Sequence, residues 1–432
     1  MSASPQPAVV PEPRSPRPPR APGRAPRELA LLLTLAAVQF THIVDFMIVM
    51  PLGPQFMRLF GIGPQPFSLL VSAYMFAAAG SGFIAAFWID RFDRKRSLLT
   101  LYAGFIAATA LCGLATGYPL LLAARIAAGV FGGVIGSLVL AIVADLVPYA
   151  RRATATAIVA ASFSLAAVAG VPLALWLAAL GSWRLPFLGL AALSFVFALA
   201  AMRLIPPLRT HLAAEQRRHP WEQLRLIFGV PNHRRAFGFT VMLMFAGFTV
   251  IPFIAPYLVA NVGIAERDLA VIYFAGGATT LVTSQVIGRL ADRYGKKRVF
   301  TQIALVSIVP ILIVTHLPPL PLATVVPLSV LSFVFVTGRF APAMALVSGA
   351  AAPHLRGSFM SFTGSVQQLG SALAAMTAGI VIGRAADGSL THFGTVGFVA
   401  VGCTLACAWL AHRIHVVADG SAARPEARPG AG

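Results

Sequence analysis

Residues 288–298 read Gly-Arg-Leu-Ala-Asp-Arg-Tyr-Gly-Lys-Lys-Arg and lie between two long apolar runs. A degenerate copy, Ala-Phe-Trp-Ile-Asp-Arg-Phe-Asp-Arg-Lys-Arg, fills residues 86–96, so that the central aspartates, Asp90 and Asp292, are 202 positions apart. Other landmarks recur within two positions of this offset: Pro51 and Pro54 correspond to Pro252 and Pro256, and Arg152 corresponds to Arg356. Weak internal symmetry of this kind is typical of secondary transporters. The sequence therefore predicts two similar halves of about 200 residues each.

The composition indicates an integral membrane protein. Hydrophobic residues make up 58% of the 432 residues, charged residues make up 11%, and the mean hydropathy is +0.81, far from the balance of a soluble domain. The net charge of +19 is distributed among the segments between the apolar runs and is not clustered as in a nucleic-acid-binding domain. We therefore expect the lipid bilayer, and no nucleic acid, as a partner.

Twelve apolar runs are each long enough to cross a hydrocarbon core of about 30 Å as a helix. Helices are expected because lipid offers no hydrogen-bond partner to unpaired backbone groups. The repeat groups the runs into two six-helix bundles, at 30–205 and 236–414, in an all-α membrane protein with a cavity between the bundles. The expected spans are 30–52, 67–89, 97–116, 119–145, 153–180, 184–205, 236–260, 268–290, 299–317, 321–350, 358–383 and 392–414.

Three polar segments complete the predicted organisation: a tail at 1–29, a linker at 206–235 and a second tail at 415–432. The first tail holds nine prolines and is expected to be disordered. In the linker, residues 221–228 are expected to form a short amphipathic helix on the membrane surface that tethers the two halves. A regulatory site is the alternative for this segment.

Lys and Arg are distributed very unequally between the two sides of the predicted bundles. Segments on the side of the termini hold 27 of the 33, whereas segments on the other side hold four. Positive residues favour the cytoplasmic side, so we expect a multi-pass protein with both termini in the cytoplasm. Arginines outnumber lysines by 30 to 3, which we associate with a GC-rich bacterial genome and hence with a bacterial inner membrane.

The two charged stretches are expected on short cytoplasmic turns, where they would act as a conformational latch. A small residue would permit close approach of helices, an aspartate would accept hydrogen bonds from a neighbouring helix, and basic residues would hold the turn at anionic lipid. A turn that only fixes topology is the alternative. The latch residues are Asp90, Arg91 and Arg94 in the first copy, and Gly288, Asp292, Arg293, Gly295 and Lys296 in the second.

These turns resemble the signature loop of the major facilitator superfamily, small-x-x-x-Asp-Arg-x-Gly-Arg-Lys, the second copy more closely than the first. Residues 121–129 resemble its fourth-helix Arg-x-x-x-Gly motif, and residues 181–187 resemble its Gly-Trp-Arg-x-x-Phe turn. Together with residues 45–54, these motifs are similar to the drug:proton antiporter branch that includes arabinose-efflux-like permeases. The resemblance covers nearly all of residues 30–414 and implies a proton-linked efflux permease.

The resemblance also implies that Asp145 joins Asp90 and Arg94 in a cytoplasmic charge relay, for which a solvated helix end is the alternative. At residues 166–175 the chain departs from the antiporter motif of this branch, because several of the expected glycines are replaced. Proton-linked uptake within the same fold is therefore kept as an alternative to efflux.

Asp45 is the one acidic residue of fourteen that lies deep within a predicted span. At 1.5 Å per residue it lies roughly 22 Å from the inner surface, and Arg125 lies at roughly 21 Å. A carboxylate at this depth can bind a proton on one side of the membrane and release it on the other. We expect Asp45 to couple transport to protons together with Arg125 and with His42, one helical turn earlier. The alternatives are a structural ion pair and a histidine that is merely a satisfied polar residue.

The second half has no acid equivalent to Asp45, because the repeat places Ala246 or Gly247 there, so proton handling is expected to be one-sided. Arg339 has no intramembrane acid near it in sequence and is expected to snorkel or to pair at a helix end. The residues expected to line the substrate cavity are Asp45, Arg125, Gln367 and Gln368.

The sequence shows no nucleotide-phosphate loop, zinc-ligand spacing or nucleophile with a base. Neither an ATP-driven pump nor an enzyme is indicated, and no cofactor or metal is expected. The three cysteines fall inside predicted spans and suggest no disulfide. We expect a monomeric secondary transporter that exports small amphiphilic compounds or metabolites in exchange for protons by alternating access. An uptake symporter and a non-transporting membrane sensor are the alternatives.

Overall fold

The computed structural model describes residues 26–208, 220–353 and 355–417. Over these ranges the chain is helical apart from short connections and one two-stranded hairpin. The predicted all-α membrane fold is confirmed. Most of the two predicted tails and the linker residues 209–219 lie outside the described residues.

The first half of the chain forms six membrane-crossing segments from consecutive helical elements. Proline begins α3, where a helix needs no backbone donor, and the Asp93 carboxylate caps α4 by accepting a hydrogen bond from the Arg96 N–H at 3.1 Å. The elements are α1 (Pro26–Ile48), α2 (Gly53–Leu59), α3 (Pro64–Trp88), η1 (Ile89–Arg91), α4 (Arg94–Leu114), α5 (Tyr118–Leu146), α6 (Tyr149–Leu165), η2 (Ala166–Gly170), α7 (Val171–Ala179) and α8 (Arg184–Leu204).

The second half repeats this arrangement after a short helix in the linker. A hairpin precedes its last helix, with Gly383 paired to Thr391 and Arg384 to Leu390 in antiparallel register. The elements are α9 (Pro220–Phe228), α10 (Pro231–Phe248), α11 (Ile251–Tyr257), η4 (Leu258–Val262), η5 (Glu266–Asp268), α12 (Leu269–Tyr294), α13 (Lys296–Val306), α14 (Ile308–Thr315), α15 (Leu322–Gly338), α16 (Phe340–Gly349), α17 (Arg356–Val381), β1 (Gly383–Arg384), β2 (Leu390–Thr391) and α18 (Phe393–Arg413).

Among the described residues, eleven helical segments are long and apolar enough to cross a membrane. The twelfth is α17, whose 26 residues extend about 39 Å at 1.5 Å per residue. Its serines, threonines and glutamines lower its hydropathy, and it packs against α3 and α10. Each of the twelve predicted spans therefore corresponds to a helical segment.

The seventh span begins earlier than the predicted 236–260, because α10, α11 and η4 together run over Pro231–Val262. Hydropathy placed its start too late, since residues 231–235 are polar. Proline suits the first turn of a helix, and Nδ1 of His233 lies 2.9 Å from the Ile227 carbonyl of α9. These contacts extend the helix into the linker, where α9 is the short helix that the sequence predicts.

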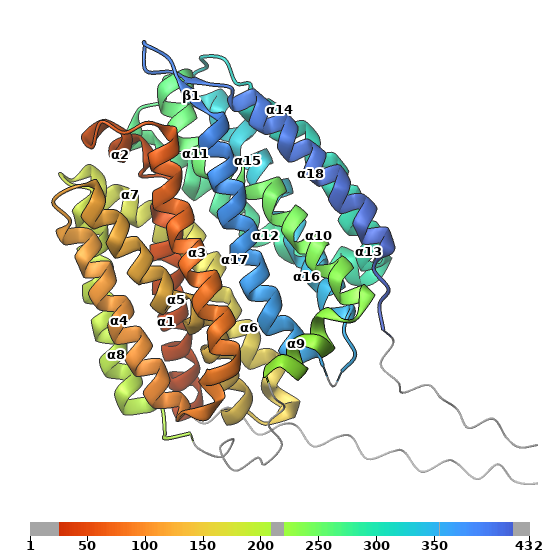
Figure 1. Cartoon of the computed structure of the whole chain (residues 1–432). Helices are drawn as coiled ribbons and strands as arrows, with labels where there is room; N and C mark the ends of the chain where they lie inside the picture. The colour runs from red at the N-terminus through yellow and green to blue at the C-terminus, as the bar shows by residue number, and fades with distance from the viewer. Residues whose placement is uncertain (1–25, 209–219, 354, 418–432) are drawn as a thin grey trace, which may run out of the picture.

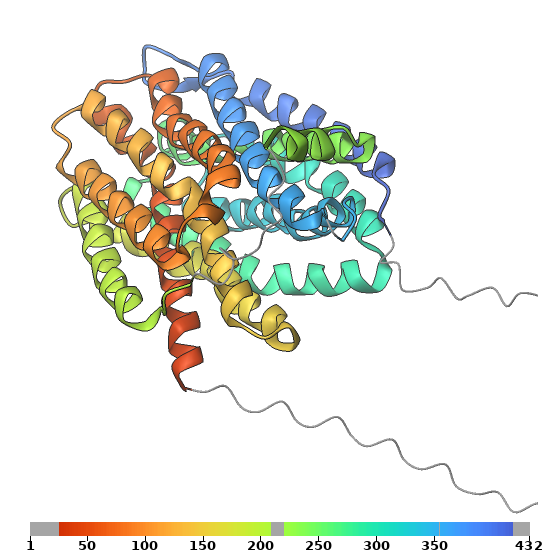
Figure 2. The same cartoon turned by 60° about the horizontal axis from the view of Figure 1, so that its bottom comes forward.

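The two bundles lie side by side, with α3 of the first packed along α17 of the second and with η2 and α7 packed on α12 (Figure 1). The end of the bundles that holds α2 and the β1–β2 hairpin is called the hairpin face. The opposite end, which holds η1 and α9, is called the linker face, and Figure 2 turns it toward the viewer.

The bundles are joined across the hairpin face. Arg58 of α2 forms an ion pair with Glu266 of η5, and the rings of Phe67 and Phe253 meet edge to face at 5.6 Å between centroids. On the opposite flank, α12 packs mainly on η2 and α7, which form the hairpin-side part of the fifth span, and only slightly on α6. The contacts between the bundles on this flank are therefore concentrated toward the hairpin face.

Large apolar side chains cover the outer surface of the bundles, as a bilayer requires. Val282, Phe398 and Trp409 are examples, each more than half exposed in the structure. A soluble protein rarely exposes apolar patches of this extent, whereas lipid favours them.

Candidate functional site

A cavity of about 410 Å³ lies between the two bundles. Most of its wall is apolar and comes from both halves, including Phe46, Met47, Met50, Met244, Phe248 and Phe333. Its polar part is made largely of hydroxyl groups, from Ser164, Tyr273, Thr280, Ser284, Ser329, Ser332, Thr337 and Ser371. Arg339 is the one charged residue among the described residues that line it. Such a wall suits a small molecule with a large apolar part and few polar groups.

Gln367 and Gln368 of α17 line this cavity, where the sequence places them. The Gln367 Nε2 group lies 2.6 Å from the sulfur of Met344 on α16, and its backbone carbonyl accepts a hydrogen bond from Ser371 at 2.8 Å. Because an amide both donates and accepts hydrogen bonds, these side chains can contact a polar group of a bound molecule.

Asp45 of α1 and Arg125 of α5 form a fully buried ion pair inside the first bundle. Nη1 of Arg125 lies 2.7 Å from Oδ2 of Asp45 and also donates to the Asp45 backbone carbonyl at 3.3 Å. Thr109 of α4 donates to the other carboxylate oxygen, Oδ1, at 3.2 Å. Three helices thus meet at one carboxylate, and the hydrogen bonds compensate part of the cost of burying the two charges.

The guanidinium of Arg125 also lies over the Tyr74 ring of α3, with 4.4 Å between Cζ and the ring centroid. Gly129, one turn along α5, makes this approach possible, because a Cβ there would lie 2.9 Å from Cα of Tyr74. The Arg-x-x-x-Gly spacing therefore joins a buried cation to the glycine that lets the neighbouring helix pack against it.

His42 lies one turn before Asp45 on α1 and is buried, but it makes no hydrogen bond to the Asp45 carboxylate. Within the described residues its Nδ1 has no hydrogen-bond partner, and its ring packs edge to face on Phe105 at 6.1 Å. It is also close to Gly132 of α5, whose missing side chain leaves room for the imidazole. The structure therefore places His42 beside the ion pair and not within it.

Asp45 and Arg125 do not line the cavity, which corrects the expectation that both form its wall. Arg125 holds the carboxylate toward α4 and α5, so α1 presents Phe46, Met47 and Met50 to the cavity instead. The ion pair and the cavity occupy different sides of the same helix.

Arg339 does not snorkel, which was one of the two arrangements expected for it, because its side chain turns inward from a helix junction. It lies at the junction of α15 and α16, its side chain is 2% exposed, and it lines the cavity. Nη1 donates to the Thr404 hydroxyl at 3.0 Å and to the Ser307 hydroxyl at 3.4 Å. The signal available in the sequence was an arginine inside a long apolar run, which is a functional candidate by default.

The first charged turn brings two of the predicted relay residues together. Nε of Arg94 lies 2.8 Å from Oδ2 of Asp145 at the end of α5, and both side chains are partly buried. Arg91 ends η1 three residues before Arg94, and the side chain of Asp90 lies outside the described part of the structure. The pairing ties the start of α4 to the end of α5 at the linker face.

The second charged turn is more open. Gly295 joins α12 to α13 with φ +94°, a backbone conformation that favours glycine. Asp292, Arg293 and Lys296 are exposed, and over the described residues the Asp292 carboxylate makes no ion pair or hydrogen bond. A Cβ on Gly288 would meet nothing within 4 Å, so the close helix approach expected at this glycine is not present in this structure.

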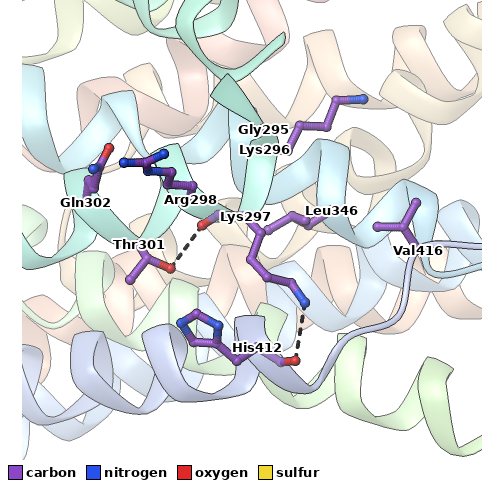
Figure 3. Close-up of a pocket in the computed structure, with 9 residues that line it drawn as sticks. All are labelled: Gly295, Lys296, Lys297, Arg298, Thr301, Gln302, Leu346, His412 and Val416. Carbon is purple, nitrogen blue, oxygen red and sulfur yellow. Dashed lines mark hydrogen bonds between the residues drawn. The ribbon is translucent and has the colours of Figure 1, made fainter. Parts of the chain in front are cut away.

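A pocket of about 550 Å³ opens beside this turn (Figure 3). It is lined by Gly295, Lys296, Lys297, Arg298, Thr301, Gln302, Leu346, His412 and Val416. The ammonium of Lys297 donates to the carbonyls of His412 and Ile414 at 3.2 and 3.1 Å, where a cation suits the C-terminal end of α18. This contact fastens the turn to the last helix.

Comparison with known sequences gives a consistent result. The sequence profile described as Major Facilitator Superfamily matches residues 35–375 and, overlapping with it, residues 236–430. The uncharacterized MFS-type transporter YceJ of Bacillus subtilis (strain 168) is 26% identical over 373 residues, which cover 84% of this chain and 91% of that protein. The similarity therefore extends over both bundles.

Solved structures share the arrangement of helices. The nucleoside transporter NupG superposes with a TM-score of 0.69 at 16% identity, over 89% of this chain and 99% of that chain. A bacterial homolog of the human lysosomal transporter Spinster, in an inward-facing and occupied conformation, superposes with a TM-score of 0.67 at 16% identity, over 91% and 95% of the two chains. At this identity the likeness concerns the fold.

Proposed function

Because the chain belongs to the major facilitator superfamily, we propose that it is a secondary active transporter that exports small amphiphilic compounds in exchange for protons. The observation that carries the proposal is a buried carboxylate, Asp45, held by Arg125 beside a largely apolar cavity between two similar bundles. Family membership supports transport by a non-enzymatic membrane protein. The coupling to protons and the outward direction of transport are our proposal.

The linker face is assigned to the cytoplasm of a bacterial cell, since most Lys and Arg lie in its segments. With this orientation we assign the structure to an inward-facing state, because the contacts that join the bundles on the α12 flank are concentrated toward the hairpin face, where Arg58 also pairs with Glu266. Alternating access then requires these contacts to break while contacts at the linker face form.

The effect of protonating Asp45 would be transmitted to the cavity through packed aromatic rings. Protonation removes the charge that holds Arg125, and Arg125 lies over the ring of Tyr74. The Tyr74 ring lies 5.6 Å from that of Phe46, which lines the cavity and lies 6.0 Å from Phe248 of the second bundle. A change at the ion pair therefore has a continuous path of side chains to both bundles, as coupling through packed elements requires.

The charged turns are proposed to govern the exchange between the two states. Asp292 has no ion pair or hydrogen bond among the described residues, whereas Arg94 is paired with Asp145. In the outward-facing state the linker-face ends of the helices come together, and Asp292 then has a neighbouring helix end as a partner. Under this proposal the second copy of the turn is the part of the latch that has yet to close in the inward-facing state.

Vesicles that contain the full chain test the proposal. A pH gradient is imposed, and accumulation of naphthalene-2-sulfonate, naphthalene-2-sulfonamide and 2-naphthylmethylammonium is measured with and without a protonophore. Protonophore-sensitive accumulation of any of them in inside-out vesicles supports export. Accumulation only in right-side-out vesicles favours the uptake symporter, and the absence of gradient-dependent flux for all three, with the protein correctly inserted, favours the sensor.

A further inference from the structure

Arg339 carries a permanent positive charge into the cavity. Its side chain is 2% exposed, and every other described residue of the cavity wall is neutral. A guanidinium stays protonated in proteins, so the cavity has a net charge of one cation at any physiological pH. An isolated buried charge in a membrane protein is costly and is usually compensated by a partner.

The part of the chain that the structure describes supplies no acidic partner to this guanidinium. Within the described ranges Arg339 forms no ion pair, and its hydrogen bonds go to two neutral hydroxyls, those of Thr404 and Ser307, both from Nη1. Nη2 makes no hydrogen bond to the described residues. The guanidinium has five N–H donors, so most of its capacity is left for something that enters the cavity.

Comparison of the two halves through the internal repeat shows that the second half lacks the carboxylate that pairs with an arginine in the first. Asp45 of the first half corresponds to Gly247 of the second, 202 positions later, and a Cβ on Gly247 would lie 3.9 Å from Nη2 of Arg339. In the first bundle a carboxylate at this position pairs with Arg125. The second bundle places a guanidinium beside the equivalent position but has glycine there, which leaves both the charge and the space unfilled.

We propose that the transported compound is an amphiphilic organic anion whose carboxylate, sulfonate or phosphate group binds Arg339. The proposal rests on the transport function proposed above and names its substrate class. An oxyanion can accept two parallel N–H bonds from a guanidinium, a geometry that gives specificity as well as affinity. Gln367 and Gln368 offer further donors, and Phe46, Phe248 and Phe333 offer a surface for the apolar body.

This arrangement discriminates against cations and neutral analogues. A cation would enter a cavity that already holds a positive charge, and no described acid lines the wall to balance it. A neutral amide would leave the buried charge uncompensated. Hydrogen bonds to charged groups are stronger than those between neutral groups. We therefore expect the anion to bind about tenfold to a hundredfold more tightly than its neutral or cationic analogues.

Equilibrium binding to the purified full chain in detergent tests the proposal without any ion gradient. The three naphthalene probes share one apolar body and differ in charge. We expect naphthalene-2-sulfonate to bind at least about tenfold more tightly than the sulfonamide and the ammonium probe. Arg339→Gln is expected to reduce this preference to less than about threefold, and Arg339→Lys to retain most of it. Arg384→Gln, in an exposed hairpin strand, is the matched control and is expected to behave as wild type.

Thermal stability separates ligand recognition from a structural role. If the charge of Arg339 is compensated only when an anion is bound, Arg339→Gln removes an uncompensated charge from the ligand-free protein. The ligand-free variant is then expected to unfold at the same temperature as ligand-free wild type or at a higher one. The sulfonate is then expected to raise the unfolding temperature of wild type but not of the variant. A structural arginine would give the opposite result, with a variant that unfolds well below wild type.

Three further results would overturn the inference: a neutral or cationic probe that binds as tightly as the sulfonate, an anion preference that survives Arg339→Gln, or no detectable binding of the sulfonate to wild type. The first and third results are measured on wild type alone, so the proposal can be rejected even if the variant fails to fold. Failure of proton-driven flux with intact anion-selective binding would instead reject the proposed coupling and leave the substrate class standing.

Discussion

Nη1 of Arg125 lies 2.7 Å from Oδ2 of Asp45, and neither side chain is more than 1% exposed. Removing one partner of a buried ion pair typically costs about 3–5 kcal/mol, because the other charge is left uncompensated. Binding of a proton to Asp45 likewise neutralises the carboxylate and leaves the charge of Arg125 uncompensated, but this change is reversible. Under the proposed function, protonation of Asp45 therefore changes the packing of the first bundle.

Asp45→Asn tests this role directly. The amide keeps the shape of the carboxylate: its oxygen can still accept the hydrogen bond of Arg125, and its NH2 group can donate to the Thr109 hydroxyl, but it cannot take up a proton. We expect proton-driven transport to fall by at least about a hundredfold, as for loss of a proton-transferring group, with probe affinity changed less than about fivefold. Flux in vesicles with a pH gradient and equilibrium binding measure the two effects.

Asp387→Asn is the matched control, because Asp387 is an exposed carboxylate held by Ser389 in the hairpin loop. It is expected to transport as wild type. Undiminished pH-driven flux in Asp45→Asn would mean that the ion pair only holds α1, α4 and α5 together.

The packing of α5 on α3 makes a second prediction, at Gly129. A Cβ at this position would lie 2.9 Å from Cα of Tyr74, a distance that side chains do not tolerate. Gly129→Ala is expected to destabilise the protein by about 1–3 kcal/mol through overpacking and to displace the ring beneath Arg125. The unfolding temperature of the purified full chain measures the loss.

Gly402→Ala provides the comparison, since a Cβ at Gly402 of α18 would meet nothing within 4 Å. In an open helical position alanine is favoured over glycine by about 0.5–1 kcal/mol, so this variant is expected to be as stable as wild type or more stable. If both variants behave alike, the close approach of α3 and α5 is not required for stability.

Much of the fold could be predicted from the sequence because lipid imposes simple demands. A span needs about 20 apolar residues and internal backbone hydrogen bonding, and both leave a direct mark on hydropathy. The start of α10 was predicted too late because hydropathy does not register proline geometry or the contact between His233 and Ile227. Helix ends are decided by such local contacts.

The candidate site was only partly predictable, for a different reason. The rise of a helix fixes depth, so the match between Asp45 and Arg125 could be found by counting residues. The rotation of each helix about its axis depends on packing, and it turned these two side chains away from the cavity. Arg339 was misplaced because the junction of α15 and α16 brings it inward toward Ser307 and Thr404.

The ion pair across the hairpin face leads to a third prediction. Arg58 and Glu266 connect the bundles, but their side chains are 62% and 20% exposed, and exposed pairs contribute only about 0.2–1 kcal/mol. Arg58→Gln is therefore expected to raise the outward-facing population by less than about fivefold. The labelling rate of a cysteine placed at the cavity residue Ile254, with an impermeant maleimide added from the hairpin face, measures this population.

Arg267→Gln is the corresponding control, because the ion pair that Arg267 forms within the described residues is with its sequence neighbour Asp268, at 3.9 Å, and does not connect the bundles. Its labelling rate is expected to equal that of wild type. An equal rate in Arg58→Gln would show that the apolar contacts of the hairpin face, such as Phe67 with Phe253, hold the bundles together by themselves.

The last prediction concerns Asp292, which is exposed and has no partner among the described residues, while Arg94 and Asp145 are paired at the same face. If Asp292 gains a partner only when the linker-face ends come together, Asp292→Asn destabilises one state of the cycle and leaves the other unchanged. We expect a large loss of transport rate, a shift toward the inward-facing state in the Ile254 cysteine assay, and probe affinity altered only modestly. The exposed basic neighbour Arg289→Gln serves as the control and should retain transport. Wild-type turnover of Asp292→Asn with binding lost would place the turn in the substrate site and contradict its assignment as a latch.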